Sequence, residues 1–293
     1  MNKTNTIKIG LIQMKMLPDP RTNLVKASKQ IVLAAAKGAQ VIVLPELFGC
    51  RYFPQYEDQS FFKLAEPIPG PTTSHFSEIS AAKKVVLIVP LFEKTRNGVY
   101  HNSVAVIDSG SILGVYRKMH IPYDPYFYEK YYFAPGDSGF PVFETRYGKI
   151  SVLICWDQWF PEAARLSALA GAQILIYPTA IGWDRTRRDK EQKKELAAWE
   201  TIQRAHAIAN SVFVAAVNRV GIEEKLVFWG NSFVSDPFGG KIVVGTSSKE
   251  QILIASCDLL QIHETRKAWP FMRDRRVDAY SSLTSEFVGA DEK

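Results

Sequence analysis

The sequence has few cysteines, no long apolar run and no block of like charge. Its three cysteines, Cys50, Cys155 and Cys257, are odd in number and far apart, which argues against both a disulfide framework and a zinc site. No apolar stretch approaches the ~20 residues that cross a bilayer. The first residues lead directly into a strand-like segment, without the apolar core of a signal peptide. We therefore expect a cytoplasmic protein with reduced thiols and no membrane partner.

The formal net charge of +6 does not come from one basic patch. The densest basic segments, residues 185–194 and 273–276, contain acidic residues, which is typical of a solvated surface. None of the five histidines stands at a spacing that is typical of metal ligands. The composition therefore argues against a nucleic-acid partner and against a bound metal.

Two segments far apart in the chain have nearly the same sequence. Gly38-Ala-Gln-Val-Ile-Val-Leu-Pro45 follows a helix expected over Leu24–Ala36, with Asn23 as its N-cap. Gly171-Ala-Gln-Ile-Leu-Ile-Tyr-Pro178 follows a second helix, expected over Pro161–Ala170. This repeat indicates two similar halves, each with a helix, a glycine, a buried strand and a proline, and it suggests that two sheets face each other.

Apolar residues make up 46% of the 293 residues, which is enough to bury one large core. No segment has the composition of a linker. We therefore expect residues 1–293 to form a single mixed α/β domain, in which helices cover a pair of largely buried sheets. The tail from about residue 263 shows little periodicity and is expected to pack on a surface or on a partner subunit.

A cysteine stands where a strand is expected to give way to a helix. The apolar, β-branched segment that begins at Lys149 stops at Cys155, and Pro161 is typical of the first turn of a helix. Backbone N–H groups at such a corner can face the atom that a sulfur attacks. A lone cysteine is usually a small buried apolar side chain. Because Trp156 and Asp157 follow it directly, a reactive thiol is an equally good interpretation here.

Several apolar strands end in a chemically distinctive residue, namely Glu46, Lys118, Cys155, Thr179 and Asn218. In α/β sheets the carboxyl ends of the strands line the ligand crevice. A carboxylate there can take the thiol proton, and an ammonium can stabilise both the thiolate and the oxyanion that forms when sulfur attacks a carbonyl. Glu46 and Lys118 alone would be an ordinary ion pair. Together with the thiol they favour a nucleophilic site.

A cysteine–histidine pair is the alternative arrangement for this site. His120 lies two residues beyond Lys118, and residues two apart in an extended segment share a face. His120 could therefore act as the base in place of Glu46. That arrangement would leave Glu46 and Lys118 without a role.

Three motifs resemble those of the nitrilase (carbon–nitrogen hydrolase) superfamily. Pro45-Glu46, Arg117-Lys118-Met-His120 and Ile154-Cys155-Trp-Asp157 match its Glu, Lys and Cys motifs in the right order, and the resemblance extends from about Ile7 to Tyr280. It implies a four-layer αββα sandwich, with Glu46 as base, Lys118 as oxyanion stabiliser and Cys155 as nucleophile. It also implies a second glutamate, which falls on Glu129, and assembly into a homodimer or a larger homo-oligomer.

Within the superfamily the sequence is most similar to the N-carbamoylputrescine amidases. The likeness is carried by four segments: Cys155–Arg165, Tyr177–Gly182, Phe133–Asp137 and Arg273–Arg276. It implies the conversion of N-carbamoylputrescine to putrescine, CO2 and ammonia, a step of polyamine biosynthesis. Residues 123–128 depart from that group, because aromatic residues replace its glycines at equal length.

Two other substrate classes and one other kind of protein remain open. The substrate could be an N-carbamoyl amino acid, β-ureidopropionate included, or a plain aliphatic amide. The chain could also keep the fold as a binding scaffold without catalysis. The intact set of Glu46, Lys118 and Cys155 argues against a scaffold.

The expected reaction uses side chains only, without a metal or an organic cofactor. Glu46 deprotonates Cys155, while Lys118 and the backbone N–H of Trp156 hold the oxyanion. Glu129 orients Lys118 or the attacking water. The small-molecule substrate would also contact Asp124 and Tyr126 in the loop after Lys118. It would further contact Thr179 at the end of its strand, and Trp183 and Asp184 in the loop that follows. Acids and aromatic faces favour an ammonium, whereas a carboxylate would require an Arg or Lys facing the pocket.

Overall fold

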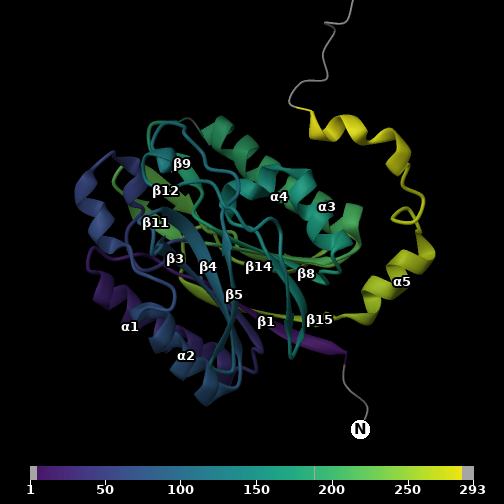
Figure 1. The fold of residues 1–293 in the computed structure, drawn as a ribbon, viewed down its shortest axis with the longest axis horizontal. Coiled ribbons are helices and arrows are strands. Elements are labelled where there is room, and N and C mark those ends of the chain that lie inside the picture. The colour runs from purple at the N-terminus through teal and green to yellow at the C-terminus, as the bar shows by residue number, and fades with distance from the viewer. Residues whose placement is uncertain (1–4, 188, 286–293) are drawn as a thin grey trace, which may run out of the picture.

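Two six-stranded sheets lie face to face and carry helices on their outer faces (Figure 1). This arrangement is seen in a computed structural model that describes residues 5–187 and 189–285. It is the expected four-layer αββα sandwich, which is thereby confirmed. No helix among the described residues is long and apolar enough to cross a membrane.

The first sheet has the strand order β15-β1-β2-β3-β4-β5. Strands β1, β2 and β3 are parallel, and α1 and α2 connect them, as the right-handed βαβ unit requires. Strands β4, β5 and β15 are antiparallel to their neighbours. The bounds are β1 Thr6–Gln13, α1 Pro20–Ala36, β2 Val41–Val43, α2 Pro71–Lys83, β3 Val86–Lys94, β4 Tyr100–Asp108, β5 Ser111–Arg117 and β15 Gln251–Asp258.

The second sheet repeats this plan in the order β14-β13-β10-β8-β7-β6. Its parallel strands β7, β8 and β10 are connected by α3 and α4, and β6 pairs with β7 as β15 pairs with β1. The bounds are β6 Val142–Thr145, β7 Gly148–Val152, α3 Pro161–Leu169, β8 Ile174–Thr179, α4 Asp189–Asn210, β10 Phe213–Asn218, β13 Phe233–Ser235 and β14 Lys241–Val244. The two similar sequence segments are the strands β2 and β8, so the two expected halves are present.

Smaller elements complete the described chain. A three-stranded sheet has the order β11-β12-β9, and α5 follows β15. The bounds are β9 Gly182–Asp184, β11 Val220–Glu223, β12 Leu226–Trp229 and α5 Leu260–Ala268, with 3₁₀ helices at Phe53–Gln55, Gln59–Leu64, Glu129–Tyr131, Cys155–Trp159, Val277–Ala279 and Ser281–Thr284.

The strands are apolar on both faces because each sheet is covered twice. In β2, Val41 and Val43 belong to the cluster between the sheets, where they join Ile150 and Ile176 of the second sheet. Ile42, on the opposite face of β2, packs with α1. Successive side chains of a strand point to opposite faces, so a strand between a sheet and a helix layer needs an uninterrupted apolar sequence.

The beginning of α1 differs from the expectation that Asn23 is its N-cap. Asp19 is the N-cap, because its carboxylate accepts from the backbone N–H groups of Arg21 and Thr22 at 3.3 and 3.0 Å, and Pro20 suits the first helical position. Asn23 lies buried inside the first turn. Its amide binds the backbone of Leu17 in both directions, at 2.7 and 2.8 Å.

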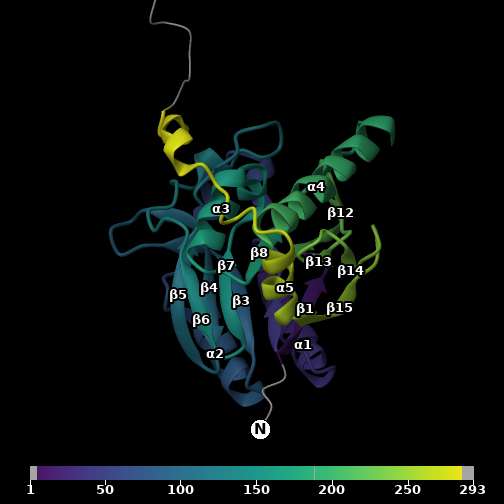
Figure 2. The same ribbon diagram turned by 90° about the vertical axis from the view of Figure 1, so that its right-hand side faces the viewer.

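The tail contains a helix that the sequence did not indicate. In α5 only Ile262 and Thr265 are buried, so two residues carry the whole apolar face and leave no periodic pattern to detect. The chain then passes by α3 (Figure 2). There, Arg165 contacts Met272. Contact of this tail with a partner subunit stays a prediction.

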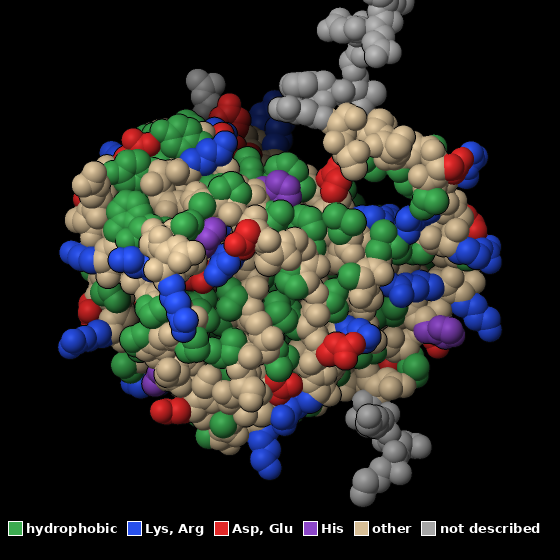
Figure 3. Space-filling view, viewed as in Figure 1, with side chains coloured by type: hydrophobic (Ala, Val, Ile, Leu, Met, Phe, Trp, Pro, Cys, Tyr) green, Lys and Arg blue, Asp and Glu red, His purple; other side chains and the backbone are tan. Residues whose placement is uncertain are grey.

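The surface mixes charges of both signs. On the face seen in Figure 3, Lys and Arg side chains lie among acidic and apolar side chains. Several of the charged groups form exposed ion pairs, such as Arg146 with Asp108 at 2.6 Å and Lys149 with Glu144 at 2.7 Å. Such pairs contribute little to stability because water screens them.

Candidate active site

The residues that follow β2, β5 and β7 come together at one end of the sandwich. There, a cavity of about 340 Å³ is lined by Cys155, Trp156 and Glu129, with Trp159 and Trp229 among its other walls. The two sheets supply different parts of the site, since Glu46 and Lys118 follow strands of the first sheet and Cys155 follows a strand of the second. Strand ends of both sheets therefore form one site.

Cys155 lies at a left-handed corner of the backbone. Its φ is 41°, and it opens the short 3₁₀ helix Cys155–Trp159. The Asp157 carboxylate holds this corner, because one of its oxygens accepts from the backbone N–H of Ile154 at 2.8 Å and from the hydroxyl of Tyr116 at 2.6 Å. A non-glycine residue adopts positive φ only when its surroundings enforce it. The Asp157 contacts provide that constraint.

Lys118 lies between two glutamates in a cluster that is fully buried. Its Nζ donates to Glu46 Oε1 at 2.8 Å and to the two oxygens of Glu129 at 2.9 and 2.7 Å. Asn102 Nδ2 also donates to Glu46 Oε1, at 2.7 Å. Glu46 Oε2 is buried and has no hydrogen-bond partner among the described residues. It is therefore the oxygen of this cluster that is free to accept a proton.

The charges in this cluster set the protonation states. Burial alone would lower the pKa of Lys118, but Glu129 and Glu46 raise it above its ordinary value, so the amine stays an ammonium. Burial raises the pKa of Cys155 well above its ordinary value, and Glu46 raises it further, while Lys118 acts in the opposite direction. The resting thiol is therefore neutral and must lose its proton when it attacks. Burial also raises the pKa of Glu129, although Lys118 opposes this.

His120 lies behind the corner rather than beside the thiol. Its Nδ1 is 2.7 Å from Asp157 Oδ1, and its backbone N–H donates to the same oxygen at 3.0 Å. Its ring stacks on Phe160 with the ring centroids 3.6 Å apart. No hydrogen bond joins His120 to Cys155 among the described residues. This geometry favours Glu46 over His120 as the partner of the thiol.

The residues expected to bind the rest of the substrate divide into two groups. Trp156, Asp124 and Asp184 line the cavity. Tyr126, Thr179 and Trp183 are not among its lining residues; they make the contacts described next.

Strand alternation explains the place of Trp183. In β9, Gly182 and Asp184 line the cavity, so Trp183 between them points to the other face, where its Nε1 donates to Gln192 O at 3.1 Å. The Thr179 hydroxyl is fully buried and donates to Tyr177 O at 3.0 Å. Tyr126 packs against an aromatic cluster that includes Phe53 and Phe133.

The structure also brings residues to the site that the sequence did not single out. Asn102 and Tyr52 bind the two glutamates, with the Tyr52 hydroxyl 2.6 Å from Glu129 Oε1. A signal for Asn102 was present, because the polar triplet His101-Asn-Ser103 interrupts an otherwise apolar strand. Tyr52 lies in an irregular loop, where no pattern marks it.

Further unexpected residues lie on the cavity wall. Arg187 and Glu195 form an ion pair there. The Nε1 groups of Trp159 and Trp229 are buried and have no hydrogen-bond partner among the described residues. The wall therefore offers acids and one guanidinium. No group of three or more His, Cys, Asp and Glu side chains within the described residues is arranged to hold a metal ion.

Comparisons with known proteins agree with one another. A sequence model of the family described as carbon–nitrogen hydrolase matches residues 8–267. The sequence is 41% identical to N-carbamoylputrescine amidase of Solanum lycopersicum, with 96% of each chain covered. It is 39% identical to citrullinase of Francisella tularensis, over 96% of this chain and 99% of that protein. The solved structure of a carbon–nitrogen hydrolase from Helicobacter pylori G27 is 43% identical, with a TM-score of 0.93 over 97% of this chain and 100% of that one.

Proposed function

The chain belongs to the carbon–nitrogen hydrolase family and acts on C–N bonds other than peptide bonds; on that premise we propose that it is a cysteine-dependent amidohydrolase. The observation that carries the proposal is the arrangement of Glu46, Lys118 and Cys155. It combines a neutral thiol, a carboxylate oxygen without a partner and a buried ammonium. These are the groups that nucleophilic attack on a carbonyl carbon needs.

The proposed reaction begins with proton transfer from the thiol to Glu46 Oε2. The sulfur of Cys155 attacks the carbonyl carbon, and the C=O electron pair moves to oxygen, where Lys118 and the backbone N–H of Trp156 stabilise the negative charge. The oxyanion then collapses, the C–N bond breaks, and Glu46 gives its proton to the departing nitrogen. Water hydrolyses the remaining thioester or thiocarbamate and releases the thiol. Glu129 holds Lys118 in place throughout.

The first candidate substrate is N-carbamoylputrescine. The relative from Solanum lycopersicum carries that name, and Asp124 and Asp184 line the cavity of this chain. The free end of this substrate is an ammonium, which carboxylates attract. Hydrolysis would give putrescine, CO2 and ammonia.

A second candidate is a ureido compound that carries both an ammonium and a carboxylate, as citrulline does. Arg187 on the cavity wall favours it, because a guanidinium can bind a carboxylate through two N–H groups. The relative from Francisella tularensis is named citrullinase. The choice between the two candidates therefore depends on whether the carboxylate improves binding.

Ammonia release from matched compounds tests both proposals. The panel contains N-carbamoylputrescine, citrulline, N-carbamoyl-β-alanine, the uncharged butylurea and an aliphatic amide, each with the wild-type enzyme and with Cys155→Ser. We expect N-carbamoylputrescine to have the largest kcat/KM, and Cys155→Ser to be inactive. A larger kcat/KM for citrulline would select the second candidate. The absence of turnover with every compound would reject the amidohydrolase and favour a binding scaffold.

Two further expectations, that the enzyme needs no metal and that it is a homo-oligomer, can each be tested directly. Every proposed step uses side chains and water, so dialysis against EDTA should leave the activity unchanged. We also propose that the enzyme is a homo-oligomer, which sedimentation of the purified protein would show directly.

A further inference from the structure

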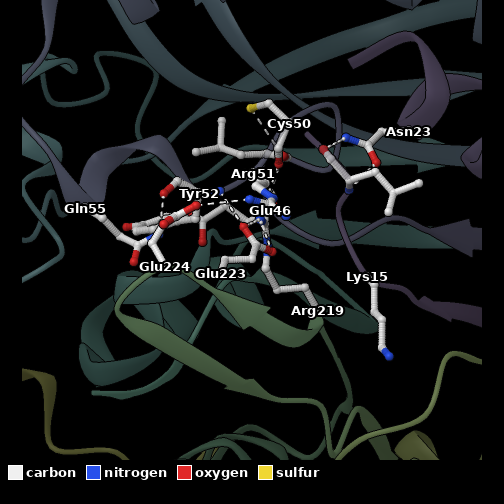
Figure 4. A network of polar contacts seen from close by, with 12 residues as sticks. Lys15, Asn23, Glu46, Cys50, Arg51, Tyr52, Gln55, Arg219, Glu223 and Glu224 are labelled. Atoms are coloured by element: carbon white, nitrogen blue, oxygen red, sulfur yellow. Dashed lines mark hydrogen bonds and ion pairs between the residues drawn. The ribbon is translucent and has the colours of Figure 1, made fainter. Parts of the chain in front are cut away.

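A second buried ion pair lies next to the loop that carries Glu46. Arg219 follows β10, and Glu223 ends β11; the two side chains are 0% and 2% exposed. Arg219 Nη1 lies 3.0 Å from each oxygen of the Glu223 carboxylate. Figure 4 shows this pair between the β11 region and the loop that follows Glu46. Neither side chain lines the cavity.

Arg219 binds three backbone carbonyls of the loop that begins at Glu46. Its Nη2 donates to Glu46 O at 2.6 Å and to Leu47 O at 2.9 Å, and its Nη1 donates to Cys50 O at 3.3 Å. Leu47 has a φ of 49°, so the chain turns sharply directly after Glu46. The carbonyls of this turn converge on one guanidinium, whose planar fork fixes several acceptors at once.

Glu223 binds the same loop a few residues later and leads to the second glutamate. Its Oε2 accepts from the backbone N–H of Tyr52 at 2.6 Å, and the Tyr52 hydroxyl donates to Glu129 Oε1 at 2.6 Å. The Arg219 guanidinium also lies over the Tyr52 ring, 5.8 Å from its centroid. The ion pair thus reaches Glu46 through the backbone and Glu129 through Tyr52.

The location of this pair matters because proton transfer is sensitive to distance. A buried ion pair is a poor way to stabilise a core, since an apolar pair of similar volume is often at least as stable. An error of about 1 Å in the position of a reacting group can lower a rate by about a hundredfold. We propose that Arg219 and Glu223 are positioning residues, which fix the Glu46 carboxylate relative to the Cys155 thiol. This inference rests on the proposed function, because it assumes that Glu46 accepts the thiol proton.

Arg219→Lys tests the proposal most directly. Lysine keeps the charge that pairs with Glu223, but one ammonium cannot reach Glu223 and all three carbonyls. We expect kcat to fall by about a hundredfold, with KM changed by less than about threefold, since the substrate pocket is untouched. The pH profile of kcat should also shift, because Glu46 no longer lies at its working distance from the thiol. Wild-type kcat and pH profile in folded Arg219→Lys would overturn the proposal.

Arg204→Lys is the matched control. Arg204 is half-buried and also donates to a loop carbonyl, Gly239 O at 2.6 Å, but it contacts neither Glu46 nor Tyr52. Its replacement should leave kcat and the pH profile unchanged. An equal loss of kcat in both variants would mean that loosening any loop suffices, and the specific role of Arg219 would be rejected.

If Arg219→Lys does not fold, a double-mutant cycle on Glu223 and Tyr52 tests the positioning role instead. Glu223→Gln keeps an oxygen for the Tyr52 N–H but removes the charge, and Tyr52→Phe removes only the hydroxyl. If Glu223 acts through Tyr52, the double variant should lose less kcat than the product of the two single losses. Strict multiplication of the two losses would mean that Glu223 acts through Arg219 and the Glu46 loop alone, which still supports the proposal, whereas wild-type kcat in folded Glu223→Gln would overturn it.

Alkylation of Cys155 by iodoacetamide separates this inference from the proposed function. The labelling rate depends on how well the thiol can lose its proton, and it needs no turnover. If the wild-type enzyme hydrolyses no compound, the amidohydrolase fails, while slower labelling in Arg219→Lys would still support the positioning role. If the wild-type enzyme is active, and Arg219→Lys and Glu223→Gln have its labelling rate and its kcat, only the positioning role fails.

Discussion

The two halves of the molecule have the same topology but contribute different chemistry. Strand β2 and strand β8 occupy equivalent places and have similar sequences, yet β2 is followed by Pro45-Glu46 and β8 ends in Pro178-Thr179. Glu46 belongs to the buried charge cluster, whereas the Thr179 hydroxyl is bound to Tyr177 O within its own strand. Equivalent places in the fold therefore have unequal roles.

The first of the parallel strands in each half shows the same contrast. In the second half β7 leads to the left-handed corner at Cys155, while β1, its equivalent, leads to the buried Met14. Glu46 and Lys118 come from the first half, Cys155 comes from the second, and Glu129 comes from the segment between them. A symmetric scaffold thus brings an acid, an amine and a thiol together because each half supplies what the other lacks. Paired substitutions at equivalent or similar places should have very unequal effects.

The largest difference is expected between the cysteines. Cys155→Ser should lower kcat by more than about 10⁴-fold, because a hydroxyl is far harder to ionise than a thiol and removal of a covalent nucleophile costs losses of this order. Cys257→Ser should keep wild-type activity, since Cys257 lies in β15, where burial raises the pKa of its thiol to about 12. Ammonia release by the two folded variants measures the difference. Activity in Cys155→Ser would contradict the assignment of the nucleophile.

The next difference is expected between Glu46 and Thr179. Glu46→Gln keeps the shape of the side chain but cannot accept the thiol proton, so kcat should fall by about 10²–10⁴-fold. Thr179→Val should change kcat by less than about threefold, because it removes a hydroxyl whose contact is Tyr177 O. Steady-state kinetics on both variants checks this pair. Similar losses in the two variants would show that the site uses the halves more equally than proposed.

His120→Asn separates the two candidate bases. Asparagine can still donate to Asp157, so the corner at Cys155 should persist, with a loss of kcat of about tenfold or less. The comparison with Glu46→Gln is made at the same substrate concentration and pH. An inactive His120→Asn beside an active Glu46→Gln would assign the site to the cysteine–histidine arrangement instead.

Effects on KM rather than on kcat are expected at the cavity wall. Asp124→Asn should raise KM for N-carbamoylputrescine by about ten- to a hundredfold and leave KM for butylurea unchanged, because only the first carries an ammonium. Arg187→Gln should raise KM for citrulline and not for N-carbamoylputrescine. If Asp124→Asn leaves KM for N-carbamoylputrescine unchanged and Arg187→Gln leaves KM for citrulline unchanged, the wall does not select by charge.

The cluster of Glu46, Lys118 and Cys155 could be predicted because each member closely follows a strand. Buried apolar strands precede Glu46 and Cys155, and β5 leads to Lys118, so the order of the strands brings the three to one end of the sandwich. Tyr52 could not be found in this way, since it lies in a loop without a periodic pattern. Arg219 does follow the apolar strand β10, but nothing in the sequence shows that its side chain binds the loop after Glu46. Their contacts depend on the exact path of a loop.

Neighbouring residues explain the remaining differences between the predicted and the observed structure. Asp19-Pro20 outweighed Asn23 as the start of α1, because proline suits the first helical position and Asp19 can cap it. Trp183 was expected at the substrate because its loop follows Thr179, but the three-residue strand β9 points it away from the cavity. A strand this short leaves no alternating pattern in the sequence from which its facing could be deduced.

Because β1 pairs with β15, the first sheet can be completed only late in the synthesis of the chain. Thr6 lies opposite Asp258, so β1 leaves the ribosome long before β15, the strand that covers its edge. All strands of the second sheet lie in one continuous part of the sequence, from Val142 to Val244, so this sheet needs no strand from elsewhere in the chain. Until Gln251 emerges, β1 presents an unpaired apolar edge that can recruit another nascent chain. Translation that stops before β15 should therefore yield aggregates, even though Glu46, Lys118 and Cys155 have already been made.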